Sequence, residues 1–214
     1  MIPFRYLQEC SLYGILDTGY LQDRDPSMVA TQMLEGGVQI LQVRAKKESL
    51  TEITWLIEKV RHVTQRFKVP LIINDYPQIA AAIGADGVHV GQNDLSVSEV
   101  RQIIGKGKWV GKSTHSLDQA MAGVAEGADY IGVGPVFATP TKPDYCPVGL
   151  NLVSQVSSRV QIPFFCIGGI VLENAHQVLE AGAKRIVVVS GILKAPDIVQ
   201  YCRNLRQLLD TNGL

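Results

Sequence analysis

Short apolar runs recur along the chain. Between them lie longer segments in which apolar residues are spaced three or four positions apart, with polar residues between. The runs are almost continuously hydrophobic, as expected for strands that are buried on both faces of a sheet. We predict strands at residues 12–16, 38–43, 71–73, 87–90, 109–111, 130–133, 164–167 and 186–189.

Between these runs, hydrophobic residues repeat at spacings of three and four, the period of a helix with one buried face. The clearest case is residues 50–63, and the last helix is expected at residues 197–209. Three predicted helix starts have the capping-box pattern, in which two side chains satisfy free backbone N–H groups. They are Ser49-x-x-Glu52, Ser96-x-x-Glu99 and Ser116-x-x-Gln119. Strands that alternate with helices predict a parallel sheet.

A glycine motif repeats at points where a helix should end and a strand begin. Its copies are Gly36-Gly37-Val38, Gly84-Ala85-Asp86, Gly127-Ala128-Asp129 and Gly182-Ala183-Lys184. Glycine provides the left-handed residue that commonly ends a helix. Successive copies are separated by two strand–helix units, so each copy marks a quarter of an eight-unit ring. We predict one domain over residues 1–214, a single-domain (β/α)8 TIM barrel of the α/β class, with an open doubly wound sheet as the alternative.

The composition excludes several classes of partner. The 214 residues are 46% apolar and carry 20 basic and 20 acidic side chains, a formal net charge of +0, so the basic footprint of a nucleic-acid-binding protein is missing. No apolar run has the length of a membrane span, and the first residues lack the apolar segment of a signal peptide. Cys10, Cys146, Cys166 and Cys202 form no C-x-x-C pair. We expect reduced thiols in a cytoplasmic protein, and the sequence leaves open whether the chain forms a homo-oligomer.

Polar residues gather at the carboxyl ends of the predicted strands, where barrels of this type carry out their chemistry. The loops that precede the strands carry mainly helix-capping residues. The strand-end segments are Gln42-Val43-Arg44-Ala45-Lys46, Asn74-Asp75, Gly91-Gln92-Asn93-Asp94, Ser113-Thr114-His115, the stretch YIGVGPVFATPTK at residues 130–142, Gly168-Gly169 and Ser190-Gly191. We therefore expect a ligand site at this end of the barrel.

Three cations and two carboxylates are expected at this end of the barrel. Arg44 and Lys46 stand at the end of one predicted strand and Lys142 follows another, and such a cluster suits a polyanionic ligand. Any one of them alone is better explained as a solvated surface charge. Asp75 and Asp94 follow neighbouring strands, and two carboxylates without a histidine or thiolate suit Mg²⁺. For each aspartate taken alone, a helix N-cap is the alternative.

The last two predicted strands end in glycine-containing loops. In barrels of this type these loops form a phosphate site from backbone N–H groups, which glycine allows the phosphate to approach closely. Tight turns without a ligand are the alternative. The sequence thus predicts two anion subsites, one assisted by a metal and one built from backbone, for two phosphorylated substrates or one long one.

Two histidines fall near the predicted site. His89 lies inside a strand, where a hydrogen-bonded core residue is favoured over a ligand-binding one. His115 follows Ser113 and Thr114 at a strand end and is a candidate for orienting a neighbour rather than for a base. The four histidines of the chain show no metal-ligand spacing, so a metal prediction rests on the carboxylates.

Taken together and in this order, the motifs resemble the thiamine phosphate synthase (thiamin-phosphate pyrophosphorylase) family over nearly the whole chain. The matching segments are Leu12-Tyr13-x-x-x-Asp17, Gln42-x-Arg44-x-Lys46, Leu71-Ile-Ile-Asn74-Asp75, Gly84-Ala-Asp-Gly-Val-His-Val-Gly-Gln-x-Asp94, Ser113-Thr-His115, Gly132-x-Gly-Pro-Val-Phe-x-Thr-Pro-Thr-Lys142, Ile167-Gly-Gly-Ile170 and Val188-Val-Ser190. Any one segment is common, whereas the ordered set is specific.

The resemblance implies a transferase of thiamine diphosphate biosynthesis. The family joins 4-amino-2-methyl-5-(diphosphooxymethyl)pyrimidine to a thiazole phosphate, forming thiamine phosphate and releasing pyrophosphate, with CO₂ when the thiazole carries a carboxylate. By similarity the pyrimidine diphosphate is bound by Gln42, Arg44, Lys46, Asn74, Ser113 and Lys142. The thiazole phosphate is bound by Thr139, Pro140, Thr141, Gly169, Val189 and Ser190. Mg²⁺ is held by Asp75 and Asp94.

The same resemblance implies a dissociative mechanism. The C–O bond to the diphosphate breaks first, and the thiazole nitrogen captures the resulting cation, so no protein nucleophile or strong base is required. Mg²⁺ and the catalytic residues Arg44, Lys46, Ser113 and Lys142 would then act on the leaving group and the cation, chiefly by neutralising charge.

Two positions depart from the family pattern. Ala45 replaces a usual glutamate and should face away from the ligand. Lys112 replaces a small or apolar residue, and it either faces the helix layer or adds charge near the site. Two other functions stay open: a thiazole tautomerase, which lacks the metal and diphosphate residues found here, and a non-catalytic sensor of phosphorylated ligands.

Overall fold

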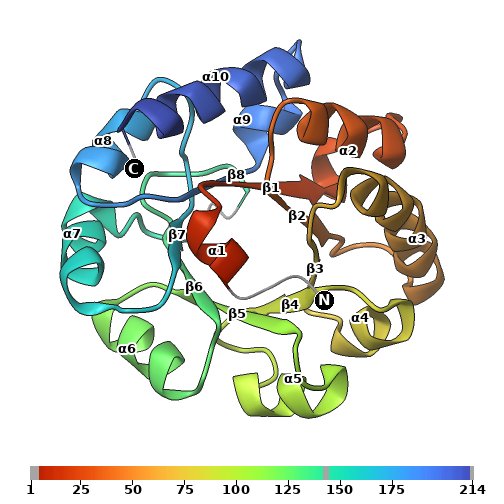
Figure 1. The fold of residues 1–214 in the computed structure, drawn as a ribbon, viewed down its shortest axis with the longest axis horizontal. Helices are drawn as coiled ribbons and strands as arrows, with labels where there is room; N and C mark the ends of the chain where they lie inside the picture. The colour runs from red at the N-terminus through yellow and green to blue at the C-terminus, as the bar shows by residue number, and fades with distance from the viewer. Residues whose placement is uncertain (1–4, 142–144, 213–214) are drawn as a thin grey trace.

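The computed structural model describes residues 5–141 and 145–212, and its eight parallel strands close into a barrel surrounded by helices (Figure 1). Strand order follows chain order, and β8 pairs with β1. The strands are β1 (Leu12–Asp17), β2 (Ile40–Arg44), β3 (Leu71–Asn74), β4 (Gly87–Val90), β5 (Trp109–Thr114), β6 (Tyr130–Val133), β7 (Phe164–Cys166) and β8 (Ile186–Val188). The predicted (β/α)8 barrel is confirmed, and closure of the ring excludes the open doubly wound sheet.

Helices α2 to α10 form the outer layer; α1 precedes β1, and α10 follows α9 directly without a strand between them. They are α1 (Arg5–Glu9), α2 (Pro26–Glu35), α3 (Leu50–Phe67), α4 (Pro77–Ile83), α5 (Val97–Ile104), α6 (Leu117–Ala125), α7 (Gly149–Arg159), α8 (Ala175–Glu180), α9 (Ser190–Leu193) and α10 (Ile198–Asn212). A short 3-10 helix, η1 (Thr18–Tyr20), continues directly from β1. The apolar runs of the sequence therefore correspond to strands, and the segments with hydrophobic residues three and four apart correspond to helices.

Two of the three predicted capping boxes are complete. The boxes that start at Ser49 and Ser96 show both reciprocal hydrogen bonds. At the third, the Ser116 side chain accepts from the backbone N–H of Gln119, but the Gln119 side chain accepts from the N–H of His115 instead of Ser116. Only one of the two capping hydrogen bonds is therefore present, because the side-chain amide of Gln119 accepts from the residue before the N-cap instead of from the N-cap itself.

The repeated glycine motif ends helices as predicted. Gly84, Gly127 and Gly182 have φ values of +68°, +85° and +101°, in the left-handed region. In the first copy Gly37 takes this conformation at +97°, whereas Gly36 has φ −78°. The helix ends therefore recur at the points that the motif marks.

Two strand boundaries differ from the sequence prediction by more than one residue. β2 begins at Ile40 instead of residue 38, because the N–H of Val38 bonds to the carbonyl of Met33 at the end of α2. β5 continues to Thr114 instead of stopping at residue 111. The buried Lys112 interrupts the apolar run without ending the strand, because its ammonium reaches Glu126, at the end of α6, at 2.5 Å. Of the two alternatives for Lys112, it thus faces the helix layer.

Strand residues point alternately into the barrel and outward to the helices, which gives two separate cores. The inner cluster consists of Leu7, Cys10, Tyr13, Ile15, Ile40, Ile72, Trp109, Tyr130, Phe165 and Val187. The larger outer cluster lies between strands and helices and contains Leu41, Val43 and Ala45. Ala45 therefore faces away from the barrel interior, as predicted.

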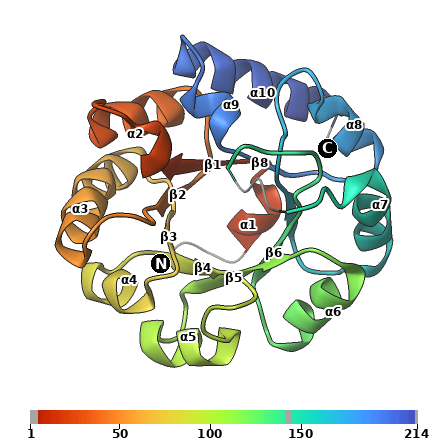
Figure 2. The same cartoon turned by 180° about the vertical axis from the view of Figure 1, so that it is seen from behind.

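The two ends of the barrel differ. At one end α1 lies across the ring (Figure 1), with Leu7 fully buried in the inner cluster and Tyr6 stacked on Trp109 at 6.4 Å between centroids. Burial of a leucine side chain contributes about 1.5–3 kcal/mol, so the burial of Leu7 stabilises the position of α1 across this end of the barrel. At the opposite end, seen in Figure 2, residues 134–141 and 145–148, which lie between β6 and α7, extend over part of the opening. The carboxyl ends of the strands meet at this second end.

The cysteines are free thiols, of which Cys10, Cys166 and Cys202 are buried and Cys146 is exposed. Burial raises the pKa of Cys10 and Cys202 to about 12, so these thiols stay protonated at neutral pH. Across residues 5–141 and 145–212, no helix combines the length and apolar character needed to span a membrane.

Candidate active site

Two adjoining cavities open at the carboxyl end of the barrel. The deeper one reaches the barrel interior, and it is lined among others by Gln42, Arg44, Asn74, Ser113, Thr139, Thr141, Gly169, Val189 and Ser190. The shallower one covers the ends of β2–β5, with a lining that includes Arg44, Lys46, Asn74, Asp75, Asp94, Ser113, Thr141 and Tyr145. Because they share Arg44, Asn74, Ser113 and Thr141, the two cavities form one continuous site, which we call the mouth.

All but two of the predicted substrate and metal residues line the mouth. Pro140 is exposed and lines neither cavity, although Thr139 and Thr141 on either side of it do. Lys142 lies outside the described residues, so its contact with a diphosphate stays a prediction. The structure thus brings together residues that are far apart in sequence, from the ends of β2 to β8.

Arg44 is held by an ion pair inside the mouth. Its guanidinium lies 2.5 Å from a carboxylate oxygen of Asp17, the residue beside it in the β1–β2 register. Asp17 is only 4% exposed, and its other oxygen accepts from the N–H of Gly19 at 2.9 Å. With both oxygens occupied, Asp17 fixes the direction in which the planar guanidinium can present its remaining N–H groups.

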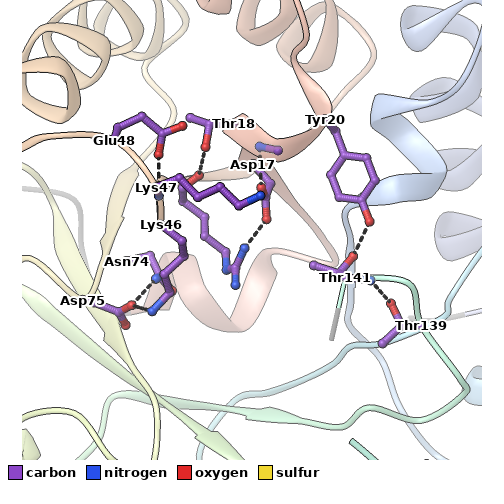
Figure 3. Close-up of polar contacts among 12 residues, drawn as sticks. Asp17, Thr18, Tyr20, Lys46, Lys47, Glu48, Asn74, Asp75, Thr139 and Thr141 are labelled. Carbon is purple, nitrogen blue, oxygen red and sulfur yellow. Dashed lines mark hydrogen bonds and ion pairs between the residues drawn. The ribbon is translucent and has the colours of Figure 1, made fainter. Parts of the chain in front are cut away.

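Lys46 forms a second ion pair, with Asp75 (Figure 3). Asp75 also accepts from the side-chain amide of Asn74 at 2.6 Å, and its backbone has φ +66°, a conformation uncommon outside glycine. Burial raises the pKa of Asp75 and the nearby Asp94 raises it further, whereas Lys46 lowers it. A cation beside Asp75 therefore favours the charged form of this carboxyl group.

The Asp75–Asp94 pair fits a divalent cation with oxygen ligands. Asp94 is exposed on the loop after β4, and its Oδ2 accepts from the N–H of Gly91 at 2.7 Å, which leaves Oδ1 for a ligand. Among the described residues, no three histidine, cysteine, aspartate or glutamate side chains form a group that could hold a metal. Two carboxylates alone suit Mg²⁺, which completes its coordination with water and phosphate oxygens.

The opposite side of the mouth is built from glycine and hydroxyl groups. Gly168 and Gly169 have φ values of +98° and +65°, and the carbonyl of Gly168 accepts from the N–H of Phe137 at 3.0 Å. A Cβ on Gly169 would lie 2.4 Å from the carbonyl oxygen of Ala138. The β7 and β6 loops are therefore in direct backbone contact, and only glycine fits between them.

Tyr20 links the first loop of the barrel to this side. Its hydroxyl lies 2.9 Å from that of Thr141, and the N–H of Thr141 bonds to the side chain of Thr139 at 3.3 Å (Figure 3). Arg24 in turn donates to the backbone carbonyls of Tyr20 and Leu193. These contacts hold the two threonines at the edge of the mouth.

His115 orients a neighbour, as predicted. Its Nδ1 lies 2.5 Å from the carbonyl oxygen of Gly134, and its ring lies 5.0 Å from that of Tyr145. His89 is hydrogen-bonded to Ser113, which agrees with the prediction of a partnered strand histidine.

Comparison with known proteins decides the family. A model of the family described as thiamine monophosphate synthase matches residues 12–192. The chain belongs to the thiamine monophosphate synthase family. It is therefore an enzyme, a transferase of thiamine biosynthesis that acts on small phosphorylated substrates.

Similar family members cover almost the full chain. A thiamine-phosphate synthase of Halalkalibacterium halodurans is 40% identical over 97% of this chain and 99% of its own length. One from Thermus thermophilus is 46% identical over 82% of this chain and 85% of its own. The solved thiamine phosphate pyrophosphorylase of Pyrococcus furiosus superposes with a TM-score of 0.87 at 29% identity, covering 96% of this chain and 98% of that one.

Sequence reasoning about this family member missed several polar residues that contact the lining of the mouth. Asp17 and Tyr13 belong to a matching motif but received no role, and Tyr20 was not singled out. Tyr130 was interpreted only as part of an apolar strand, yet its hydroxyl lies 3.1 Å from that of Tyr13 inside the barrel. The available signal was chemical, because a tyrosine buried in a strand needs a hydrogen-bond partner for its hydroxyl.

Proposed function

We propose that the mouth joins 4-amino-2-methyl-5-(diphosphooxymethyl)pyrimidine to a thiazole phosphate, forming thiamine phosphate and releasing pyrophosphate. The observation that carries this proposal is the division of one mouth into two sides. The ionic side contains Arg44, Lys46, Asp75 and Asp94, and the glycine side contains Gly168, Gly169, Thr139 and Thr141. The ionic side has the charges for a diphosphate, and the glycine side has the backbone access for a single phosphate. Both substrates would thus lie within one continuous cavity.

On the ionic side, Arg44 and Lys46 bind the diphosphate, with Gln42, Asn74 and Ser113 on the pyrimidine. Lys142 is proposed to join them on the strength of its position in the sequence. Asp75 and Asp94 would hold Mg²⁺, which supplies positive charge to the diphosphate when it is bound. As the diphosphate departs with the electron pair of the C–O bond, Arg44 and Lys46 stabilise its growing negative charge.

On the glycine side, Thr139, Pro140, Thr141, Gly169, Val189 and Ser190 bind the thiazole phosphate. The lone pair of the thiazole nitrogen forms the new C–N bond with the pyrimidine methylene, so the chain itself supplies neither nucleophile nor base. A carboxylated thiazole would lose CO₂ afterwards, and the electron pair of the broken C–C bond would be neutralised by uptake of a proton from solvent. The contribution of this side is to hold the nitrogen in line and limit water.

The test is release of pyrophosphate when both substrates are mixed with the protein and Mg²⁺. We expect stoichiometric pyrophosphate and thiamine phosphate, and neither product if one substrate or the metal is withheld. Isomerisation of the thiazole without pyrophosphate would indicate a tautomerase. Binding of both substrates without turnover would indicate a sensor.

A further inference from the structure

A chain of hydrogen bonds crosses the barrel interior directly below the mouth. Five side chains from five strands take part: Gln42, Tyr13, Tyr130, His89 and Ser113. Gln42 Nε2 donates to the Tyr13 hydroxyl at 2.7 Å, which lies 3.1 Å from the Tyr130 hydroxyl. The Tyr130 hydroxyl lies 3.2 Å from His89 Nδ1, and His89 Nε2 lies 2.9 Å from Ser113 Oγ. The chain therefore begins and ends at residues that line the mouth.

Donation by the amide of Gln42 gives this chain of hydrogen bonds one consistent direction. Tyr13 is 1% exposed, so its single hydroxyl hydrogen needs an acceptor inside the barrel; Gln42 Nε2 is a donor, and we assign this hydrogen to the Tyr130 oxygen beside it. Tyr130 must then donate to Nδ1 of His89. The imidazole is thus neutral with its hydrogen on Nε2, and it donates that hydrogen to Ser113. Ser113 keeps its own hydroxyl hydrogen for a partner other than His89.

The chain is rigid because its centre is buried and tightly enclosed. Tyr13 and Tyr130 are each 1% exposed, and both pack edge-on against Phe165 with centroids 5.4 and 5.6 Å away. A Cβ on Gly111 would lie 2.1 Å from the Tyr130 ring, so glycine is required to admit it. Burial raises the pKa of both tyrosines, which keeps them neutral donors over the physiological range.

We propose that His89 is a positioning residue that holds Ser113 as a hydrogen-bond donor toward the pyrimidine substrate. Its tautomer is set by Gln42 through Tyr13 and Tyr130. This inference rests on the proposed function, which places Gln42 and Ser113 at the pyrimidine. Gln42 then presents its carbonyl oxygen to the mouth and Ser113 presents its hydrogen. An acceptor and a donor at fixed positions suit an aminopyrimidine, which offers amino N–H groups and ring-nitrogen acceptors.

The histidine tautomer can be observed without turnover. In ¹⁵N-histidine-labelled protein, the protonated and unprotonated ring nitrogens give separate NMR shifts, and we expect His89 as the neutral Nε2–H form. Tyr130→Phe removes the donor to Nδ1 and should yield a mixture of tautomers. An Nδ1–H tautomer or an imidazolium in the unmodified protein would overturn the proposal, as would no change in Tyr130→Phe. This result is independent of whether the proposed reaction is correct.

Kinetics distinguish positioning from structural support. His89→Leu should raise KM for the pyrimidine diphosphate about tenfold, as expected for loss of one oriented hydrogen bond, and leave KM for the thiazole phosphate unchanged. His89→Gln, whose amide can donate where Nε2 did, should recover most of the loss. When Ser113→Ala is also present, His89→Leu and His89→Gln should have the same KM for the pyrimidine diphosphate. His62→Gln, at an exposed position of α3, is the matched control.

The proposal would be overturned if His89→Leu raised KM equally for both substrates. It would also be overturned if His89→Leu and His89→Gln still differed in KM for the pyrimidine diphosphate in the Ser113→Ala background. Thermal unfolding of each variant shows whether it is folded. If His89→Leu does not fold, the tautomer measurement still decides, because it uses the unmodified histidine. If pyrophosphate is not released by the unmodified protein, the proposed function fails while the tautomer result stands.

Discussion

The ends of β2–β4 and of β6–β8 face each other across one mouth, yet they are built from different chemistry. The first side carries charged side chains, and Arg44 and Lys46 are each already paired with a carboxylate. The second side carries glycines and hydroxyls, and Gly168 and Gly169 have left-handed φ values. Charge defines the first side, and backbone shape defines the second.

This difference bears on the proposed binding of each ligand. On the ionic side, the proposed Mg²⁺ would take the place of Lys46 at Asp75, which would free Lys46 for the diphosphate. On the glycine side, backbone contacts such as that of Gly169 with Ala138 already exist, so the phosphate meets a formed surface. Single-charge variants should therefore alter chemistry with little effect on folding, whereas a glycine variant should alter both.

The largest effect is expected from Asp94→Ala. Loss of one metal carboxylate should lower turnover by about 10²–10³-fold, similar to removal of a group that stabilises developing charge. The melting temperature should hardly change, because Asp94 is exposed on a loop and accepts a local hydrogen bond from Gly91. Steady-state rates with varied Mg²⁺ and thermal unfolding provide the measurement. Asp118→Ala, an exposed aspartate in the first turn of α6, is the control. Equal rates in the two variants would remove Asp94 from the metal site.

Gly169→Ala should have the next largest effect, on the other side. The new Cβ would meet the carbonyl oxygen of Ala138 at 2.4 Å and force strain at φ +65°. We expect a loss of about 1–3 kcal/mol in unfolding free energy and a higher KM for the thiazole phosphate only. Gly105→Ala has a similar φ of +80° with nothing within 4 Å, so it separates backbone strain from the steric contact. A rise in KM for the pyrimidine diphosphate instead would contradict the division of the mouth.

Asp17→Asn should have a moderate effect on the ionic side. The variant keeps the shape but removes the charge that orients Arg44, so KM for the pyrimidine diphosphate should rise about tenfold, the equivalent of one charged hydrogen bond. Initial-rate kinetics measure this, with Asp210→Asn as the control because Asp210 pairs with Arg206 at an exposed site. A fall in KM would mean that Asp17 competes with the substrate for Arg44 rather than positioning it.

Tyr20→Phe should have the smallest effect. It removes one hydroxyl contact to Thr141, worth about 0.5–1.5 kcal/mol, so KM for the thiazole phosphate should rise roughly two- to tenfold. Tyr76→Phe is the control, since Tyr76 packs against the outer cluster. If turnover falls without a change in KM, Tyr20 acts on the reaction rather than on the position of the loop.

The sequence predicted those features that local patterns encode. Apolar runs located all eight strands, and Ser49 and Ser96 located helix starts, because strand burial and capping depend on nearby residues. Because successive side chains of a strand point to opposite faces, the sequence also predicted that Arg44 and Lys46 face the ligand while Ala45 faces away from it. The gathering of predicted site residues in one mouth follows from closure of the barrel, which brings all carboxyl ends of the strands together.

Contacts between distant elements could not be predicted from such patterns. The Asp17–Arg44 pair depends on the register of β1 against β2, and the Tyr20–Thr141 contact joins residues 121 positions apart. In the half-formed box at Ser116, the competing N–H belongs to the preceding strand end, which the four-residue motif does not include.

Simultaneous binding of the two anions tests the central claim most directly. Thiazole phosphate can be titrated by calorimetry into protein saturated with Mg²⁺ and pyrophosphate, and then into protein without pyrophosphate. If the ionic and glycine sides are separate subsites, thiazole phosphate binds one to one in both titrations and does not displace pyrophosphate. Competition between the two anions for a single site would contradict this account.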